Sequence, residues 1–216
     1  GECKTPGGKL VAVDLDVSHG ALTAVRVRGD FFVHPEHAAK PSLDAIANAL
    51  TGARADLDVP SLAARVRAAL PFDVELLENG DTRNVLDHYR YWRMDAIVAN
   101  LDSRRHKFHV AIENWQHDLN IGSIVRTANA FLAAEVHIIG HRRWNRRGAM
   151  VTDRYQHVRH HNTVEEFVEW ARTCGLGAGG GALPIIGIDN VDGCQKIETF
   201  DMPKSCVFLF GKEGPG

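Results

Sequence analysis

Three stretches of the sequence combine residue types that can do chemistry at short spacing. The first runs from Asn114 to Phe131 and contains Asn120, Gly122, Ser123 and Arg126. It lies between a predicted strand and a predicted helix, at the sheet edge where open α/β folds bind ligands. Arg126 would present its planar guanidinium to a phosphate or a ribose from the second turn of the helix. A capped amphipathic helix with a solvated arginine explains the pattern equally well.

The second stretch follows a predicted buried strand and reads Gly211-Lys212-Glu213-Gly214-Pro215-Gly216. Exposed amides in such a turn can hold a ligand, and the Glu213 carboxylate can accept hydrogen bonds from ribose hydroxyls. The signal is weak by itself, because a left-handed turn after a strand has the same residue types. Its glycine spacing also differs from that of dinucleotide-binding loops.

The third stretch, residues 141–161, holds six arginines, four histidines and a single acid, Asp153. Trp144 and Tyr155 alternate with the charged residues, which suits phosphate contacts combined with base stacking. We expect an RNA-binding surface here rather than a solvated charged face. The residues expected to contact RNA are Arg142, Arg143, Trp144, Arg146, Arg147 and Arg154.

Two groups of histidines have spacing that invites a metal-site hypothesis. They are His157, His160 and His161, and the pair His34 and His37. Neither group has a nearby cysteine or an obvious fourth ligand, which zinc sites require. We therefore predict no metal site.

Composition narrows the functional classes. The 216 residues are 44% hydrophobic and carry a formal net charge of -2, which excludes a uniformly basic nucleic-acid binder but allows a local basic site. No apolar run approaches the roughly 18 residues of a membrane span, and Gly1-Glu2-Cys3-Lys4 lacks the apolar core of a signal peptide. The four cysteines form no CxxC pair. We expect a cytoplasmic protein without membrane contact.

Residues 1–72 are predicted to form a small α+β unit. Alternating apolar residues indicate strands at 10–17 and 21–27, joined by the turn Ser18-His19-Gly20. Ser42 is expected to cap a helix that ends at Gly52, and Pro60-Ser61 to open a second helix closed by Pro71.

Residues 73–80 resemble a linker, and residues 81–216 are predicted to form a larger α/β unit. A long amphipathic helix is expected from Asp81 or Thr82 to Leu101. Strands follow at 108–112, 136–139, 183–188 and 206–210, with helices at 121–131 and after Thr163, where Phe167, Val168 and Ala171 should point inward. Short apolar strands that alternate with helices predict a parallel sheet covered on both faces.

The motif residues point to a family. The run from Ala111 to Gly140, with Asn120, Gly122, Ser123 and Arg126, resembles motif 1 of the SpoU/TrmH RNA ribose methyltransferases. Residues 211–216 resemble their motif 2, and the likeness covers about residues 80–216. The resemblance implies a knotted α/β fold of the SPOUT type, a homodimer, and S-adenosylmethionine held in the knot. It also implies methylation of a ribose 2′-hydroxyl in rRNA or tRNA, and no action on DNA.

The same resemblance implies roles for individual residues. Arg126, Asn120 and Glu213 would be catalytic. The cofactor would be held by Ile188, Asp189, Phe210, Gly211 and Gly216. Arginine is a poor base because its pKa exceeds ~12, so we expect Arg126 to hold phosphate and stabilise developing alkoxide charge.

The sequence departs from the family pattern at three points. Leu132 stands where glycine is usual, and Lys212 where asparagine or glutamine is common. The third motif of the family is not found up to Gly216, so we expect it downstream and expect this chain to bind the cofactor poorly. The segment from Trp144 to Ala149 is similar to an actinobacterial-type branch.

The N-terminal unit has a separate resemblance. Residues 6–11 and 28–32, followed by Pro35-Glu36, resemble the small C-terminal accessory domain of lipoate–protein ligases. Two alternatives to an RNA methyltransferase therefore stand. One is an RNA-binding module without catalysis, and the other is an accessory role in lipoate activation through residues 1–72.

Overall fold

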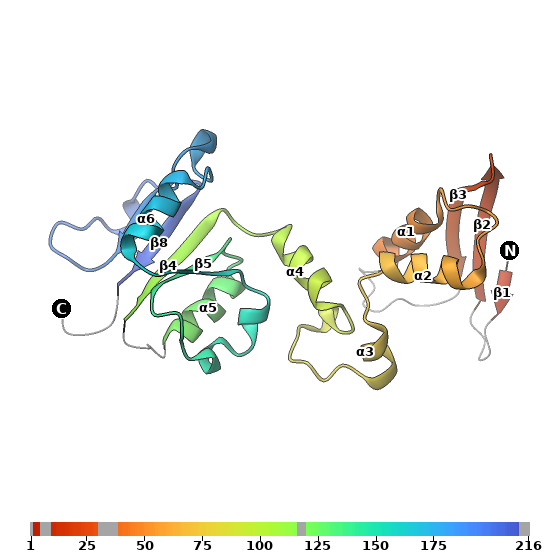
Figure 1. Cartoon of the computed structure of the whole chain (residues 1–216), viewed down its shortest axis with the longest axis horizontal. Coiled ribbons are helices and arrows are strands. Elements are labelled where there is room, and N and C mark those ends of the chain that lie inside the picture. Colours follow the sequence, from red (N-terminus) through yellow and green to blue (C-terminus); the bar gives the residue numbers. More distant parts are fainter. Residues whose placement is uncertain (1, 5–9, 30–38, 116–119, 212–216) are drawn as a thin grey trace. The chain divides into compact units, whose positions relative to one another are not determined.

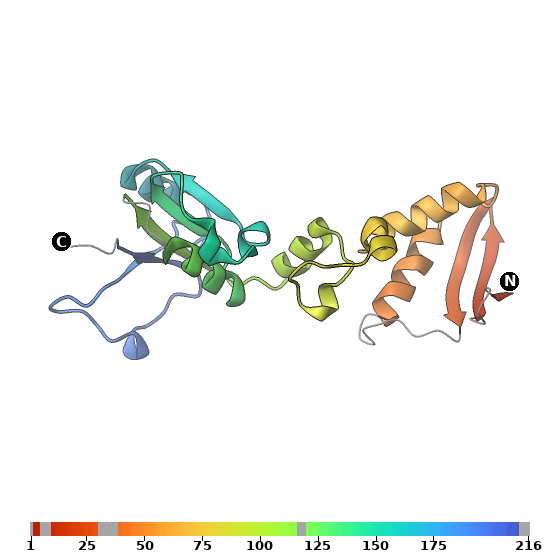
Figure 2. The same cartoon turned by 90° about the horizontal axis from the view of Figure 1, so that it is seen from below.

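The computed structural model describes residues 2–4, 10–29, 39–115 and 120–211. The chain divides into two compact units, Gly1–Ala96 and Ile97–Gly216. In the first unit, an antiparallel sheet is formed by β1 (Glu2–Lys4), β2 (Leu10–Ser18) and β3 (Ala21–Gly29). The predicted hairpin of β2 and β3 is confirmed (Figure 2), with Val17 opposite Leu22 and positive φ at His19 and Gly20 in the turn.

Two helices cover this hairpin, and both begin earlier than predicted. The first, α1 (Ala39–Leu50), starts three residues before Ser42, so Ser42 lies inside the helix instead of capping it. The second, α2 (Val59–Ala69), is capped by Asp58, whose carboxylate accepts from the Ser61 amide at 3.0 Å. The core between helices and sheet centres on three buried residues, Leu22, Val25 and Ala53.

The expected long helix from residue 81 to Leu101 is wrong. The structure has two shorter pieces there, the 3-10 helix η2 (Asp87–Tyr89) and α4 (Met94–Asp102). The buried Asp81 carboxylate accepts hydrogen bonds from the backbone amides of Arg83 and Tyr91 at 3.0 and 2.8 Å. Tyr91 has φ +65°, which no α-helix accommodates. Side-chain bonds to the backbone therefore replace the helical ones.

The segment predicted as a linker contains a helix of its own. This helix, α3 (Val74–Asn79), is capped by Asp73, whose carboxylate accepts from the amides of Glu75 and Leu76. It ends at Gly80, which has φ +88°. The cap residue and the glycine therefore delimit a six-residue helix inside residues 73–80.

The second unit is built on a five-stranded parallel sheet. Its strands are β4 (Phe108–Asn114), β5 (Val136–Gly140), β6 (Val158–His161), β7 (Ile185–Ile188) and β8 (Cys206–Phe210). They lie in the order β6-β5-β4-β8-β7, and all neighbouring pairs are parallel. The predicted parallel sheet is thereby confirmed. Strand β6 was not predicted, and β7 begins two residues later than expected.

Helices cover both faces of this sheet, as predicted (Figure 1). On one face, α5 (Asn120–Ala130) buries Ile121 and Val125 against Val110 and Ile138. On the other, α6 (Val164–Thr173) buries Phe167 against a cluster that includes Ile139 and Val207. Thr163 caps α6 as expected, but Val168 is 46% exposed and does not point inward.

Four short 3-10 helices lie in the described loops of the second unit. They are η3 (Arg146–Ala149), η4 (Thr152–Arg154), η5 (Ala178–Gly180) and η6 (Ile197–Thr199). None of the helices in the described ranges has the length and apolar character that crossing a bilayer requires. Cys174, Cys194 and Cys206 are free thiols.

Candidate functional site

The carboxyl ends of the parallel strands bring distant parts of the sequence to one edge of the sheet. Asn114 at the end of β4 lies beside Gly140 at the end of β5. Phe210 at the end of β8 lies between Ile112 of β4 and Ile188 of β7. The predicted cofactor residues Ile188 and Phe210 are therefore neighbours in the sheet. This edge is where open α/β sheets bind ligands.

Asn114 anchors the loop that follows β5. Its side chain is fully buried, and Nδ2 donates to the carbonyl oxygens of His141 and Arg143 at 2.6 and 2.9 Å. The His141 amide donates back to the Asn114 carbonyl at 2.7 Å. The Asn114 Oδ1 accepts no hydrogen bond from the described part of the chain. From the sequence we assigned Asn114 no role of its own. Its place at the end of an apolar strand was the signal that could have pointed to this role.

Two glycines seat the basic loop on α5. A Cβ added to Gly122 would lie 2.8 Å from the Gly148 Cα and from the Asn145 carbonyl oxygen. A Cβ on Gly148 would lie 3.0 Å from the Ser123 amide nitrogen. Gly122 thus allows a close backbone approach, and its partner is the η3 segment of the same chain. Side chains larger than hydrogen would separate α5 from this loop.

A cavity of about 420 Å³ lies between α5 and strands β4 and β8. The predicted residues Asn120 and Phe210 both line it, together with Ser123. Apolar side chains form most of the remaining wall: Phe108, Val110, Ile124, Ala128, Phe131 and Phe208. A mostly apolar wall with a few polar groups at its rim is typical of small-molecule sites.

Arg126 lies in the middle of α5, on a different side from this cavity. Its side chain is exposed, and it forms no hydrogen bond or ion pair with the described residues. Successive residues of an α-helix are rotated by about 100° around its axis, so Arg126 points roughly 120° away from Asn120, which lines the cavity. Arg126 is therefore placed to meet a ligand arriving from solvent.

The predicted cofactor residues in the described part of the chain lie at the same strand ends; Gly216 and the predicted catalytic residue Glu213 lie outside it. Ile188 is half-buried, Asp189 is exposed after β7, and Gly211 is exposed after β8. Leu132, which stands in place of the usual glycine, has φ +52°. A leucine in this left-handed region costs roughly 1–2 kcal/mol relative to a right-handed conformation, so the departure carries backbone strain.

The first half of the basic stretch presents charge to solvent. Its five predicted RNA-contacting arginines are all exposed: Arg142, Arg143, Arg146, Arg147 and Arg154. Trp144 is half-buried and packs against the core beneath α5. The Arg146 guanidinium lies 5.6 Å from the centre of its ring and pairs with Asp153 at 3.3 Å. Trp144 thus supports the loop from inside.

The second half of the basic stretch belongs to the sheet instead. His157 forms a hydrogen bond with Asp102 at 2.8 Å, and Arg159 pairs with Glu135 at 3.0 Å. His161 is buried in β6. His157 and Arg159 are exposed as well, but each is paired with an acidic residue, so the five predicted arginines of residues 142–154 make up most of the exposed basic surface.

Comparisons with known proteins concern the second unit. Residues 107–216 match the family model described as the SpoU rRNA Methylase family. The SpoU methyltransferase AviRb from Streptomyces viridochromogenes, solved in complex with the cofactor AdoMet, is similar at 21% identity and a TM-score of 0.43. That alignment covers 50% of this chain and 43% of the AviRb chain, so this chain spans less than half of its length. A search of curated proteins found no match. Residues 1–72 lie outside the family match, and their resemblance to a lipoate–protein ligase accessory domain stays a prediction.

Proposed function

Because the chain belongs to the SpoU rRNA methylase family, we propose that it transfers a methyl group from S-adenosylmethionine to a ribose 2′-hydroxyl of rRNA or tRNA. The observation that carries this proposal is the position of the motif residues. Asn120 and Phe210, 90 residues apart by their numbers, line the same cavity beneath α5, and Arg126 projects from the same helix as Asn120.

The residues at this edge suit the cofactor. A cavity of about 420 Å³ lies within the range of ~300–1,000 Å³ typical of small-molecule sites. Its apolar wall, to which Phe210 contributes, suits a flat ring. Asp189 does not line this cavity, but its exposed carboxylate follows the neighbouring strand β7 and can accept hydrogen bonds from ribose hydroxyls. We assign binding to the two adjacent strand ends, Ile188–Asp189 and Phe210–Gly211. When bound, S-adenosylmethionine supplies a methyl group activated by a positively charged sulfur.

The protein residues would act mainly by orientation. The attacking 2′-oxygen must lie in line with the bond that breaks, and holding reactants in such a geometry supplies much of the rate. Asn120 would donate to or accept from the acceptor nucleotide at the rim of the cavity. Arg126 would bind the adjacent phosphate and stabilise the negative charge that develops on the 2′-oxygen as its proton leaves.

The basic loop would hold the RNA. Exposed arginines on residues 142–154 can contact several phosphates, which fix the position of a nucleic acid without reading its sequence. The backbone contact between Gly122 and η3 fixes this loop on the helix that carries Arg126. Phosphate binding and ribose orientation are thereby built on one rigid support. The homodimer and the knot implied by the family resemblance remain part of the proposal.

The experiment that tests this function is methyl transfer to RNA by the protein at its full natural length. The protein is incubated with S-adenosylmethionine labelled in its methyl group and with ribosomal and transfer RNA, and the RNA is digested with alkali. A 2′-O-methyl group removes the nucleophile of alkaline cleavage, so we expect the label in alkali-resistant dinucleotides. Label on a base would refute the ribose assignment. RNA binding without any transfer would favour the non-catalytic RNA-binding module.

A further inference from the structure

Three histidines on neighbouring strands form a hydrogen-bonded row inside the second unit. His109 lies on β4, His137 on β5 and His161 on β6. His109 Nδ1 is 3.0 Å from His137 Nε2, and His137 Nδ1 is 3.0 Å from His161 Nε2. All three are buried, and His137 has no exposed surface. His109 and His137 are each the second residue of their strand, near the amino ends, whereas His161 is the last residue of β6.

The surroundings keep these imidazoles neutral. Burial, with a smaller contribution from Arg159, lowers the pKa of His109 to about 4. Burial, together with the neighbouring His109 and His161 rings and Arg159, lowers the pKa of His137 to about 2. The ring of Trp170 covers His137, with the ring centres 4.1 Å apart. A neutral imidazole has one N–H and one free lone pair, so each ring offers a lone pair at neutral pH.

Glu135 brings a carboxylate to the same place. Its Oε1 accepts from Arg159 Nε at 3.0 Å, while Oε2 lies 3.8 Å from His137 Nε2. Ligand atoms of His109, Glu135 and His137 all lie within 4.8 Å of one another. Two imidazole nitrogens and one carboxylate oxygen therefore lie close enough together to bind one ion.

We propose that His109, Glu135 and His137 bind a divalent transition-metal ion, with zinc as the best match, and leave its fourth position open. Zinc bonds of ~2.0–2.1 Å place tetrahedral ligand atoms about 3.3–3.4 Å apart. The observed separations of 3.0 and 3.8 Å lie on either side of that value. Neutral imidazole and carboxylate are ligands that zinc accepts together.

The groups behind these three residues orient them as metal ligands are usually oriented. The Nδ1–H of His137 can donate to His161 while Nε2 faces the ion, and Arg159 can hold Glu135 Oε1 while Oε2 faces the ion. The ion would replace one hydrogen bond, between His109 and His137, and leave both supporting contacts in place. Binding would therefore turn the His109 and His137 rings from each other toward the ion.

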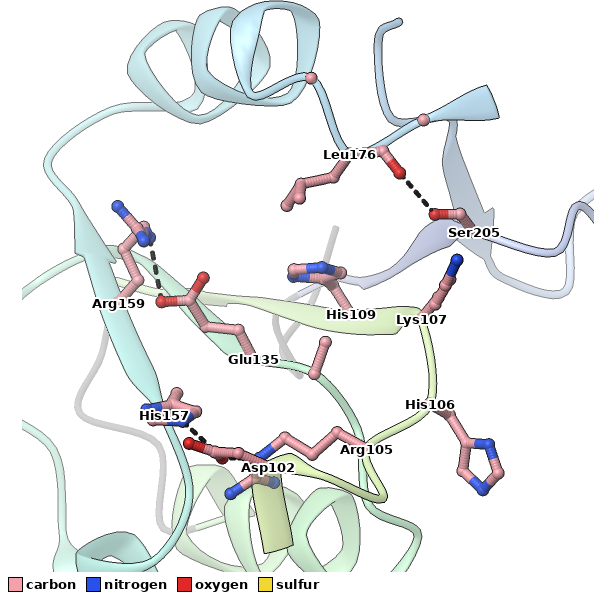
Figure 3. A pocket seen from close by; sticks show the side chains of 13 residues that line it. Asp102, Arg105, His106, Lys107, His109, Glu135, His157, Arg159, Leu176 and Ser205 are labelled. Atoms are coloured by element: carbon pink, nitrogen blue, oxygen red, sulfur yellow. Dashed lines mark hydrogen bonds and ion pairs between the residues drawn. The ribbon is translucent and has the colours of Figure 1, made fainter. Parts of the chain in front are cut away.

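An open pocket gives access to the site (Figure 3). Its volume is about 680 Å³, and its wall includes His109, Glu135, Lys107 and Ser205. Lys107 precedes β4 and Ser205 precedes β8, so the pocket lies at the amino ends of the strands, opposite the edge proposed for methyl transfer. The charged groups that face it are Asp102, Arg105, Lys107, Glu135 and Arg159, with His106 and His157. Two of the three cations are paired with these carboxylates, Arg105 with Asp102 and Arg159 with Glu135. We expect water or hydroxide as the fourth ligand.

The test uses the whole chain, stripped of metal with a chelator and titrated with Co²⁺ and then Zn²⁺. We expect one Co²⁺ per chain with the intense visible absorption of four-coordinate cobalt, and its displacement by one equivalent of Zn²⁺. Glu135→Gln and His109→Gln should each weaken Zn²⁺ binding at least tenfold. His106→Ala and His157→Ala remove histidines from the same pocket and should leave the affinity unchanged.

Several results would contradict the proposed metal site. The site is refuted if the wild-type chain does not bind Co²⁺, or if bound Co²⁺ shows just the weak absorption of six-coordinate cobalt. It is also refuted if Glu135→Gln and His109→Gln fold and bind Zn²⁺ with unchanged affinity. Circular dichroism establishes whether these variants fold. If neither does, the wild-type cobalt spectrum and the Zn²⁺-induced rise in its unfolding temperature decide, and the absence of either refutes the site.

Discussion

Gly122 and Gly148 meet backbone to backbone, since a Cβ on Gly122 would lie 2.8 Å from the Gly148 Cα. This contact joins α5, which carries Asn120 and Arg126, to the loop that carries the exposed arginines. Because neither glycine has a side chain, α5 and the loop pack in direct contact. This contact fixes the exposed arginines, proposed to bind RNA, relative to Asn120 and Arg126, proposed to act on its ribose. The strand ends supply the rest of the site.

Replacing Gly122 with alanine should therefore destabilise the second unit. The new methyl group meets backbone atoms that cannot rotate away, and overpacking of this kind costs about 1–3 kcal/mol. The free energy of unfolding, measured by chemical denaturation, tests this. Gly187→Ala is the matched control, because a Cβ at Gly187 meets nothing within 4 Å. Equal effects of the two substitutions would contradict the close contact.

In the first unit, Asp81→Ala should lower the free energy of unfolding by about 3 kcal/mol, since removing one partner leaves a buried ion pair uncompensated. The Asp81 side chain is fully buried and bonded to the Arg83 guanidinium at 2.8 and 2.7 Å. Asp56→Ala removes an exposed pair with Arg54 and should cost less than about 1 kcal/mol. A similar loss in both variants would show that burial of the Asp81 pair does not matter.

The same carboxylate predicts a pH dependence. The hydrogen bonds from the Arg83 guanidinium hold the pKa of Asp81 well below its usual range, whereas in the unfolded chain it is about 3.9. The unfolded state therefore binds this proton first, and the stability that Asp81 contributes is lost as the pH falls below about 4. Denaturation between pH 6 and pH 3 should show a steeper loss for the wild type than for Asp81→Ala. Parallel curves would exclude Asp81 as the source.

The sequence predicts the elements whose structure follows from their own apolar pattern, and it misses those that depend on contacts with distant residues. Strands β4 and β8 were predicted because runs such as Val110–Ile112 are apolar throughout, as buried parallel strands are. Strand β6 was missed because Val158-Arg159-His160-His161 has a single apolar residue, and its buried histidine is satisfied by a partner on β5. The helix expected up to Leu101 failed because apolar spacing does not reveal the bonds that Asp81 makes to the backbone.

The carboxyl-edge site could be predicted from the sequence, whereas the proposed metal site could not. That Asn120 and Phe210 would lie close together follows from a parallel sheet, whose strands all end at one edge. The convergence of His109 and His137, 28 residues apart, depends on strand register and on which face each residue occupies. Because these histidines are far apart in the sequence, their spacing does not reveal that they lie close together in the fold.

The exposed basic loop should add to RNA affinity by neutralising phosphates. Arg142→Ala combined with Arg147→Ala should weaken RNA binding and reduce the slope of log affinity against log salt by about 1.4, because each phosphate that an arginine neutralises on single-stranded RNA accounts for roughly 0.7. Fluorescence anisotropy over a range of salt concentrations measures both. The control is Arg172→Ala, which removes an arginine paired with Glu169 on α6. An unchanged slope in the double variant would place the RNA elsewhere.

The most direct test of methyl transfer at the carboxyl edge is the turnover of Arg126→Ala in the protein at its full natural length. We predict that methyl transfer to RNA falls at least about 10²–10³-fold, the loss typical when a group that stabilises developing charge is removed. S-adenosylmethionine affinity, measured by calorimetry, should stay nearly unchanged, because Arg126 does not line the cavity beside Asn120 and Phe210. Arg172→Ala should retain wild-type turnover. Near-wild-type turnover of Arg126→Ala would contradict the role proposed for this edge of the sheet.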